Sequence, residues 1–343
     1  MVYVRSCLPH RAWVLAFFLL ICSGCEVEQT RISAAGATFP AELFRTWARA
    51  YQEIDPGMIL EYESVGSGRG VELFLDQAVD FAVANAPITP EERSRSDEGV
   101  HVIPSAAGVL VLGFDVPGVD SLKLSHEAIA GIYLGTITRW DDPRILQENQ
   151  GVELPDLPIV PVFRSGPSGS TVAMTAYLSA ISPTWREQYG ISGLVQWPAG
   201  VGALGSRGML ETIRNTVGSI GYVDFGRVDE SEGRINVAEL QNESGAYVRP
   251  DIDSIRDAIE DADYSPTSMV TFDAKSPGAY PIVVISYVLA REEYQDERIG
   301  QAVKGFLGYA MTDGQQDGLA IGFPGLPEPV RSQAEAAVDS IDY

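Results

Sequence analysis

The sequence contains very little cysteine or histidine, and most of what it has lies near the N-terminus. The three cysteines are Cys7, Cys22 and Cys25, and only two of the three histidines, His101 and His126, lie further along the chain. This distribution excludes a disulfide framework and a thiolate metal cluster from the body of the protein. The two histidines are not spaced as zinc ligands usually are. We therefore expect neither a metal site nor a cofactor.

Basic residues are also scarce. The chain of 343 residues has 24 Lys and Arg against 47 Asp and Glu, which gives a formal net charge of -23. Such an excess of negative charge repels polyanions, so we exclude nucleic acid and an acidic membrane face as partners. With 45% hydrophobic and 21% charged residues the chain is typical of a globular protein. Its length favours two domains, at the usual ~100–200 residues each.

The N-terminal residues have the pattern of a secretory signal peptide. Arg5 and Arg11 form a basic region before an apolar run over 12–21. That run is shorter than the roughly 20 residues that a membrane-spanning helix requires. We therefore predict a signal peptide over 1–24 and an extracytoplasmic, periplasmic location.

The predicted cleavage site ends in a cysteine. Ser23-Gly24-Cys25 resembles a bacterial lipobox, although Cys22 stands where that motif usually has leucine. The resemblance implies that Cys25 becomes the lipid-modified first residue of the mature protein and anchors it to a membrane. The alternative is ordinary secretory cleavage nearby. After the cysteine we expect a polar tether over 25–31.

The body of the chain alternates strand-like and helix-like segments. A strand pattern over 59–65 leads into a glycine-rich turn and a helix, and a second over 158–163 leads into the turn 164–171 and another helix. This alternation favours an α/β fold with parallel strands. Further buried strands are expected over 79–84, 108–114, 220–223 and 281–289, and helices over 42–55, 124–134 and 299–309.

Three segments place hydroxyl residues at a predicted helix start. A helix start exposes unpaired N–H groups and a partial positive charge, so it favours anions. Any one of the three is explained as well by ordinary N-capping. Together they would supply enough donors for a tetrahedral oxyanion without a metal. The segments are Thr38 with Phe39, Ser67 with Gly68, and Ser168-Gly169-Ser170.

Arg164 is the natural cation for such a site. It follows an apolar strand directly and precedes Ser168 by four residues. That position puts it at the carboxyl edge of the sheet, where open α/β folds bind ligands. Its planar guanidinium can donate two parallel hydrogen bonds to two oxygens. The alternative is a surface arginine without a ligand.

Seven segments resemble, in order, those of the PstS-type phosphate-binding proteins, the extracytoplasmic receptors of phosphate ABC importers. The resemblance runs from about residue 32 to the end. It implies an α/β, type II periplasmic-binding-protein fold, with two lobes joined by hinge strands that close on one inorganic phosphate. It also implies ABC permease subunits as membrane partners, a monomer, and no enzyme activity. The segments are Gly36-Ala37-Thr38-Phe39-Pro40, Val65-Gly66-Ser67-Gly68, 79–87, Ile132-Tyr133-Leu134-Gly135, Arg139-Trp140-Asp141-Asp142, 164–170 and Gly221-Tyr222-Val223.

The resemblance also implies the lobe boundaries and the ligand set. Lobe I would combine 32–105 with 286–343, and lobe II would be 106–285. The ligand donors carried over are Thr38, Phe39 through its backbone, Ser67, Arg164, Ser168, Gly169 through its backbone, and Ser170, with Asn85 at the position of a family aspartate.

The chain departs from the family pattern at two points. Asn85 replaces an aspartate that, in the family, accepts the proton of hydrogen phosphate and repels sulfate. An asparagine can present either an acceptor or a donor, so we expect weaker rejection of sulfate or a shifted pH optimum. Gly166-Pro167 stands where the family usually has an acid near the arginine. Arg164 would then be held by another acid or by the ligand alone.

Three other functions remain open on the sequence. A receptor for another tetrahedral oxyanion such as sulfate fits Asn85, and a sensor or adhesin could keep the fold without the ligand. A secreted phosphatase-like enzyme would need a nucleophile with a base, or metal ligands. Its only candidate carboxylates are Asp80 and Asp141-Asp142, which we interpret as a strand-turn cap and a helix start. We therefore assign no catalytic residue.

One motif is interpreted as a coincidence. Residues 200–205 form a G-x-G-x-x-G, with Asp224 about 20 residues further on. A dinucleotide site needs an apolar strand directly before the motif, and Trp197-Pro198-Ala199 does not provide one.

Overall fold

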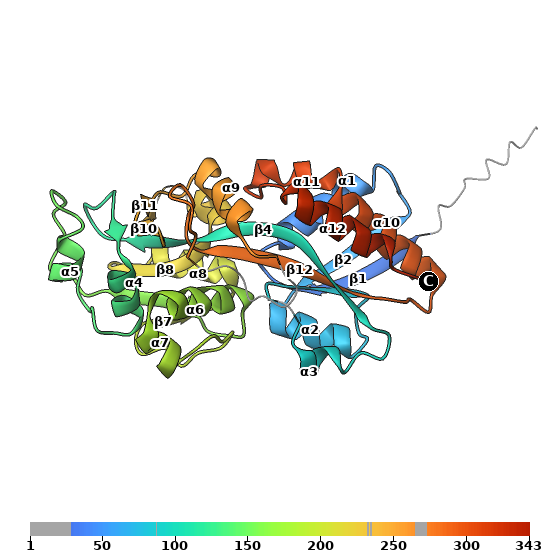
Figure 1. Cartoon of the computed structure of the whole chain (residues 1–343), viewed down its shortest axis with the longest axis horizontal. Helices are drawn as coiled ribbons and strands as arrows, with labels where there is room; N and C mark the ends of the chain where they lie inside the picture. The colour runs from blue at the N-terminus through green and yellow to red at the C-terminus, as the bar shows by residue number, and fades with distance from the viewer. Residues whose placement is uncertain (1–28, 87, 232, 234, 265–272) are drawn as a thin grey trace, which may run out of the picture.

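The computed structural model describes residues 29–86, 88–231, 233, 235–264 and 273–343. These residues form two α/β halves that lie end to end (Figure 1). Two long strands, β4 (Val100–Asp115) and β12 (Val283–Arg291), run from one half into the other. Both ends of the described chain lie in the same half, so the second half is an insertion between β4 and β12.

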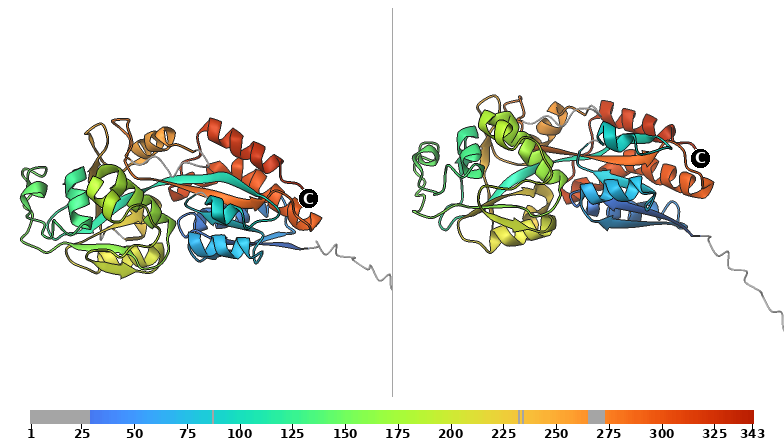
Figure 2. Two further views of the ribbon diagram at one scale, coloured as in Figure 1. Left: turned by 60° about the horizontal axis from the view of Figure 1, so that its bottom comes forward. Right: turned by 90° about the horizontal axis from the view of Figure 1, so that it is seen from below.

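The first half is built from both ends of the chain. Its sheet lies between α1, α10, α11 and α12 on one side and α2 and α3 on the other (Figure 2). Its elements are β1 (Thr30–Gly36), α1 (Ala41–Tyr51), β2 (Met58–Ser64), α2 (Ser67–Leu75), β3 (Phe81–Ala84), α3 (Pro90–Arg93), α10 (Glu297–Met311), α11 (Gly314–Asp317), η2 (Leu319–Ile321) and α12 (Glu328–Asp339).

The second half comes from the middle of the chain. Helix α8 packs on β6 and β8, and α9 packs on β4. Its elements are β5 (Lys123–Leu124), α4 (His126–Tyr133), α5 (Pro143–Leu146), β6 (Val160–Arg164), α6 (Gly169–Ile181), α7 (Pro183–Gln188), β7 (Val201–Ala203), α8 (Gly205–Arg214), β8 (Ser219–Asp224), η1 (Phe225–Ser231), β9 (Asn236–Val237), β10 (Glu239–Gln241), β11 (Tyr247–Val248) and α9 (Ile252–Asp261).

A single sheet path connects the halves, in the order β2-β1-β3-β12-β4-β8-β6-β7, with β9 beside β4. The outer strands of each half are parallel, as the sequence pattern predicts. The crossing strands are antiparallel to their neighbours. Strand β4 pairs with β12 over 100–109 and with β8 over 110–115, so one continuous strand serves both halves.

Two sequence expectations need correction at the start of the body. The tether expected over 25–31 is too long, because Thr30 and Arg31 already belong to β1. The small residues that follow, such as Ala34 and Ala35, gave no clear strand signal, yet both are fully buried. Helix α1 begins at Ala41, so Thr38 and Phe39 lie in the loop before it rather than in its first turn.

The core explains why α1 forms where the apolar spacing predicts a helix. Its buried face includes Leu43, Phe44 and Trp47. The Phe44 ring lies 6.2 Å from Phe81 of β3 and 6.4 Å from Phe306 of α10. Truncating a buried aromatic of this kind costs about 3–5 kcal/mol, so this cluster fixes α1 and the loop before it.

Candidate functional site

The loops that carry the predicted ligand residues meet where the two halves touch. Strands β1, β3 and β6 end at Gly36, Ala84 and Arg164, and each continues into one of these loops. Helices α2 and α6 begin there, at Ser67 and Gly169. The region between these loops is referred to below as the seam.

At Gly169 the two halves lie in close contact at the seam. A Cβ added to it would lie 2.4 Å from Asn85 Cβ and 2.6 Å from Ser67 Oγ. No other residue type fits at that distance, so glycine is required by the contact. A Cβ at Gly66 would likewise lie 3.2 Å from the Pro167 carbonyl oxygen. The start of α6, where a helix has unpaired N–H groups, thus rests directly against the first half.

Ser67 and Asn85 are joined by a hydrogen bond. The Asn85 backbone N–H donates to Ser67 Oγ at 3.1 Å. Ser67 is 8% exposed and Asn85 is 2% exposed. Because the Ser67 oxygen already accepts this bond, its hydroxyl proton remains for another acceptor.

Arg164 is buried at the end of β6. Its backbone N–H donates to the Tyr222 hydroxyl at 2.9 Å, and its Nη1 donates to Thr38 Oγ1, in the other half, at 3.4 Å. Its Nε is buried and has no hydrogen-bond partner among the described residues. Burial lowers the pKa of Arg164, opposed by the nearby Tyr222 and Asp224. A buried guanidinium with an unused N–H is costly unless an anion binds it.

The carboxylate whose charge acts on Arg164 is that of Asp224, at the end of β8. Asp224 is buried, and its Oδ2 lies 3.6 Å from Arg227 Nε. Its negative charge acts to raise the pKa of Arg164. Because Gly166-Pro167 provides no carboxylate beside Arg164, the sequence analysis expected another acid or the ligand to hold it. Asp224 is such an acid, although it lies far from Arg164 in the sequence.

Ser168 and Ser170 frame the first turn of α6. Ser168 Oγ caps the helix by accepting from the Thr171 N–H at 3.4 Å. Ser170 is buried and, with Arg164, Tyr222 and Asp224, borders a gap that has no room for a water molecule. Capping explains Ser168 by itself, whereas the contact of its neighbour Gly169 with the other half does not follow from capping.

Ser206 is a site residue that sequence reasoning missed. It lies in the first turn of α8, its Oγ is 3.0 Å from Thr38 Oγ1, and it borders the same gap beside Arg164. The available signal was a glycine followed by a serine at a helix start, the same signal used for Ser67. It lay at the end of the G-x-G-x-x-G motif, and the region after it was too mixed in pattern to predict α8.

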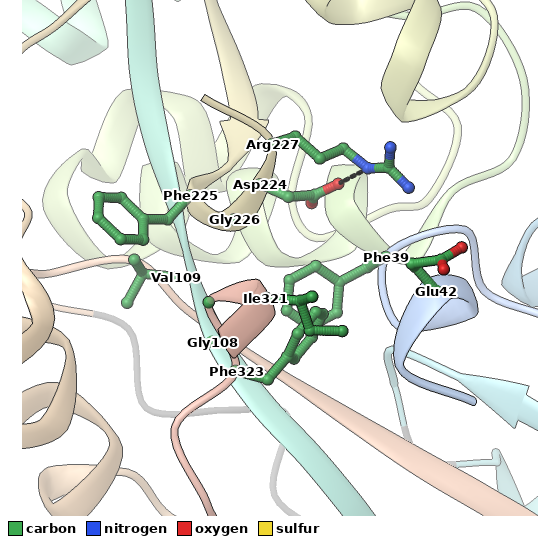
Figure 3. A pocket seen from close by; sticks show the side chains of 11 residues that line it. Phe39, Glu42, Gly108, Val109, Asp224, Phe225, Gly226, Arg227, Ile321 and Phe323 are labelled. Atoms are coloured by element: carbon green, nitrogen blue, oxygen red, sulfur yellow. Dashed lines mark ion pairs between the residues drawn. The ribbon is translucent and has the colours of Figure 1, made fainter. Parts of the chain in front are cut away.

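A larger cavity of about 290 Å³ lies at another part of the contact between the halves (Figure 3). The ring of Phe39 forms part of its wall, with Phe323 at a ring-centroid distance of 5.0 Å. Its charged groups are Glu42 and the ion pair of Asp224 with Arg227, drawn as a dashed line in Figure 3. The cavity is mainly aromatic and glycine-lined, so it lacks the converging donors of the seam.

The chemistry of the seam suits an anion. Its groups are a guanidinium, hydroxyls, helix N–H groups and an amide, nearly all of them donors. Within the part of the chain that the structure describes, no group of three or more His, Cys, Asp or Glu could hold a metal ion. The three carboxylates singled out in the sequence as catalytic candidates have structural partners: Asp80 accepts from Ser33, Asp141 pairs with Arg139, and Asp142 caps α5.

Comparisons with known proteins agree on one family. A family model described as a PBP superfamily domain matches residues 24–313. The phosphate-binding protein PstS of Xylella fastidiosa (strain 9a5c) is 31% identical over 316 residues, covering 91% of this chain and 85% of that protein. PstS of Methanocaldococcus jannaschii is 34% identical over 338 residues, covering 90% of this chain and 86% of that protein.

Solved structures show the same fold. A high-affinity periplasmic phosphate-binding protein (PfluDING) bound with phosphate superposes with a TM-score of 0.73 at 21% identity, covering 90% of this chain and 93% of that one. A phosphate-binding protein from Stenotrophomonas maltophilia superposes with a TM-score of 0.71 at 20% identity, covering 90% of this chain and 94% of that one. The α/β periplasmic-binding-protein fold predicted from the sequence is confirmed.

Proposed function

The chain belongs to the PBP superfamily and, within it, to the PstS-type phosphate-binding proteins, and on that premise we propose that it is the receptor that delivers inorganic phosphate to an ABC importer. Its relatives are named as phosphate-binding proteins, so no catalytic residue and no cofactor are assigned.

One observation carries the proposal. Arg164 is buried at the contact between the halves, keeps an Nε–H without a partner among the described residues, and reaches Thr38 of the other half. A charge placed in this way needs an anion between the halves to repay its desolvation.

The proposed ligand set draws on both halves. Arg164 gives the charge, and backbone N–H groups and hydroxyls surround the remaining oxygens. The set is Thr38, Phe39 through its N–H, Ser67, Asn85, Arg164, Ser168, Gly169 through its N–H, and Ser170.

In this proposal the halves act as two lobes that close on the anion. Lobe I comprises 32–105 with 286–343, lobe II comprises 106–285, and β4 and β12 form the hinge. Closure excludes water, which strengthens each hydrogen bond to the ligand. A monomer suffices, because one chain supplies every proposed ligand group.

In this proposal the protein works outside the cytoplasm, beside ABC permease subunits in the membrane; the phosphate-binding protein PfluDING, which has the same fold, is described as periplasmic. The predicted signal peptide over 1–24 and the lipid site at Cys25 lie outside the described residues. Palmitate labelling of the wild type and of Cys25→Ser tests the anchor. Labelling that requires Cys25 and stops with globomycin supports it, and an unlabelled wild type removes it.

Calorimetry tests the function directly. The purified mature protein is titrated with phosphate, arsenate and sulfate, and p-nitrophenyl phosphate is supplied in a parallel assay. We expect phosphate to bind with 1:1 stoichiometry and p-nitrophenyl phosphate to remain intact. Absence of phosphate binding at millimolar concentration would overturn the proposal, and steady hydrolysis of the ester would replace it with a phosphatase.

A second candidate ligand is sulfate. The observation that favours it is the side chain of Asn85, whose Oδ1 accepts from Ser286 Oγ at 2.7 Å and is therefore occupied outside the ligand set.

A further inference from the structure

Asn85 lies where the crossing strand β12 passes the end of β3. Tyr287 of β12 pairs with Ala84, so Ser286 is opposite Asn85 in the same antiparallel register. Both side chains are buried, at 0% exposure for Ser286 and 2% for Asn85. The Ser286 hydroxyl donates to Asn85 Oδ1 at 2.7 Å. Ser286 thus holds the side-chain amide of Asn85 although the two residues are about 200 positions apart in the sequence.

An irregularity in the crossing strands sets the position of Ser286. Strand β4 carries one extra residue, Ser105, opposite the step from Ser286 to Tyr287. Ser105 Oγ donates to the Ser286 carbonyl at 3.0 Å, and Gln315 Nε2 donates to the Ser105 carbonyl at 3.3 Å. Bulges of this kind re-aim a side chain. These bonds hold the backbone of Ser286 in place opposite Asn85.

A side-chain amide has one acceptor oxygen and one donor nitrogen, so fixing one end decides what the other end offers. With Oδ1 bound to Ser286, Nδ2 is the group that Asn85 can present to a ligand in the seam, beside the start of α6 at Gly169. We infer that Ser286 is a positioning residue that turns the Asn85 amide into a donor toward the bound anion, and that this pair sets which oxyanion the receptor accepts. This inference rests on the proposed function.

The other groups at the seam offer hydrogens as well. The Ser67 oxygen already accepts from the Asn85 N–H, which leaves its proton for the ligand. Arg164 and the first N–H groups of α6 are donors only. The acid Asp224 pairs with Arg227 and acts on Arg164 through its charge. Hydrogen phosphate therefore finds no carboxylate acceptor at Asn85, whereas sulfate has no proton to donate and requires only donors.

The experiment measures the dissociation constants of phosphate and sulfate by calorimetry at neutral pH. For the wild type we expect the two constants to agree within about tenfold, because neither anion is rejected for its protonation. Asn85→Asp is isosteric and supplies an acceptor, so it should raise the ratio of the sulfate constant to the phosphate constant by about 100-fold or more. Ser286→Ala frees the amide to turn its oxygen to the ligand and should raise the same ratio, by about tenfold.

Ser286→Thr is the matched control, because it keeps the hydroxyl and should keep the wild-type ratio. Thermal unfolding without ligand verifies that each variant is folded. If Ser286 has a purely structural role, Ser286→Ala will weaken the binding of both anions equally and leave the ratio of the two dissociation constants unchanged. That result overturns the inference. A wild type that binds phosphate and rejects millimolar sulfate also overturns it, and Asp224→Asn would then test Asp224 as the proton acceptor. If the wild type binds neither phosphate nor sulfate, the proposed function itself is overturned.

Discussion

Gly226 of η1 and Gly322, which follows η2, touch across the contact between the two halves. A Cβ added at Gly322 would lie 2.9 Å from the Gly226 Cα, and one added at Gly226 would lie 2.8 Å from the Ile321 carbonyl oxygen. Together with Gly169 against Asn85, this is a second place where the halves meet without a side chain between them. Close approach of the halves therefore depends on glycine both within the proposed ligand set, at Gly169, and outside it, at Gly226 and Gly322.

Gly226→Ala should weaken phosphate binding without touching the anion. The added methyl group clashes only when the halves are together, and overpacking of this kind costs about 1–3 kcal/mol, which corresponds to about tenfold or more in affinity. Gly226 has no positive φ, so alanine introduces no backbone strain. Calorimetry gives the affinity, and thermal unfolding of the ligand-free protein should be nearly unchanged.

Gly308→Ala is the control for this substitution, because a Cβ at Gly308 in α10 meets nothing within 4 Å. It should leave phosphate affinity at the wild-type value. Equal affinities for Gly226→Ala and Gly308→Ala would show that the contact at Gly226 does not limit binding.

Arg164→Met should abolish high-affinity binding while preserving the ligand-free fold. Each charge-assisted hydrogen bond contributes about 1.5–3 kcal/mol, so losing two weakens phosphate on the order of 100-fold or more. Methionine fills a similar space and removes a buried charge whose Nε has no partner among the described residues. We expect the ligand-free unfolding temperature to hold or rise. Phosphate titration and thermal unfolding measure the two effects.

Arg207→Ala removes the same charge from the exposed surface of α8, where the Arg207 side chain is 82% exposed. Its phosphate affinity should match the wild type. If Arg164→Met behaves like Arg207→Ala in titration, the anion does not bind at Arg164.

The fold was predictable where sequence periodicity and packing agree. The strand ending at Arg164 and the helix starting at Gly169 follow directly from an apolar run, a glycine turn and a helical pattern. Strand β1 was not predicted, because its small residues, Ala34 and Ala35, are buried by their surroundings rather than by a strong strand preference of their own.

The parts of the site that sequence analysis missed are those made by long-range pairing. Ser206 reaches Thr38 only because α8 meets the loop after β1, and Ser286 reaches Asn85 only through the register of β12 with β3. The bulge at Ser105 has no sequence signal, because it exists only in the pairing of β4 with β12. Local patterns predict which residues begin helices, and pairing decides which of them meet.

Phosphate affinity should change little with ionic strength, although the chain carries a formal net charge of -23. The proposed donors act over hydrogen-bond distances inside a buried seam, while the repulsive field of the surface is screened over about 10 Å at 0.1 M salt. Between about 0.1 and 1 M KCl we expect less than a threefold change, or slight strengthening as repulsion is screened. Titrations across this range provide the measurement. A tenfold loss of affinity would point to an exposed ion pair instead.

Tyr222 should make the stability of the protein fall at alkaline pH. Its hydroxyl accepts from the Arg164 N–H and lies 2.8 Å from Thr171 Oγ1. Burial raises the pKa of Tyr222 to about 12, whereas a free phenol ionises near pH 10. Below pH 10 both the folded and the unfolded states keep the proton, so Tyr222 does not make the free energy of unfolding depend on pH. Between pH 10 and 12 the unfolded state loses its proton first, and stability falls by about 3 kcal/mol in all.

Urea unfolding of the wild type and of Tyr222→Phe at several values between pH 8 and 11.5 isolates this contribution from the other buried tyrosines. At pH 8 the phenylalanine variant should be less stable, because the Arg164 N–H and the Thr171 hydroxyl lose a partner. Above pH 10 the wild type should lose stability faster than the variant, so the gap between their free energies of unfolding narrows. A gap that stays constant over the whole range would mean that Tyr222 ionises at the same pH in both states, and burial at the end of β6 would then not hold its proton.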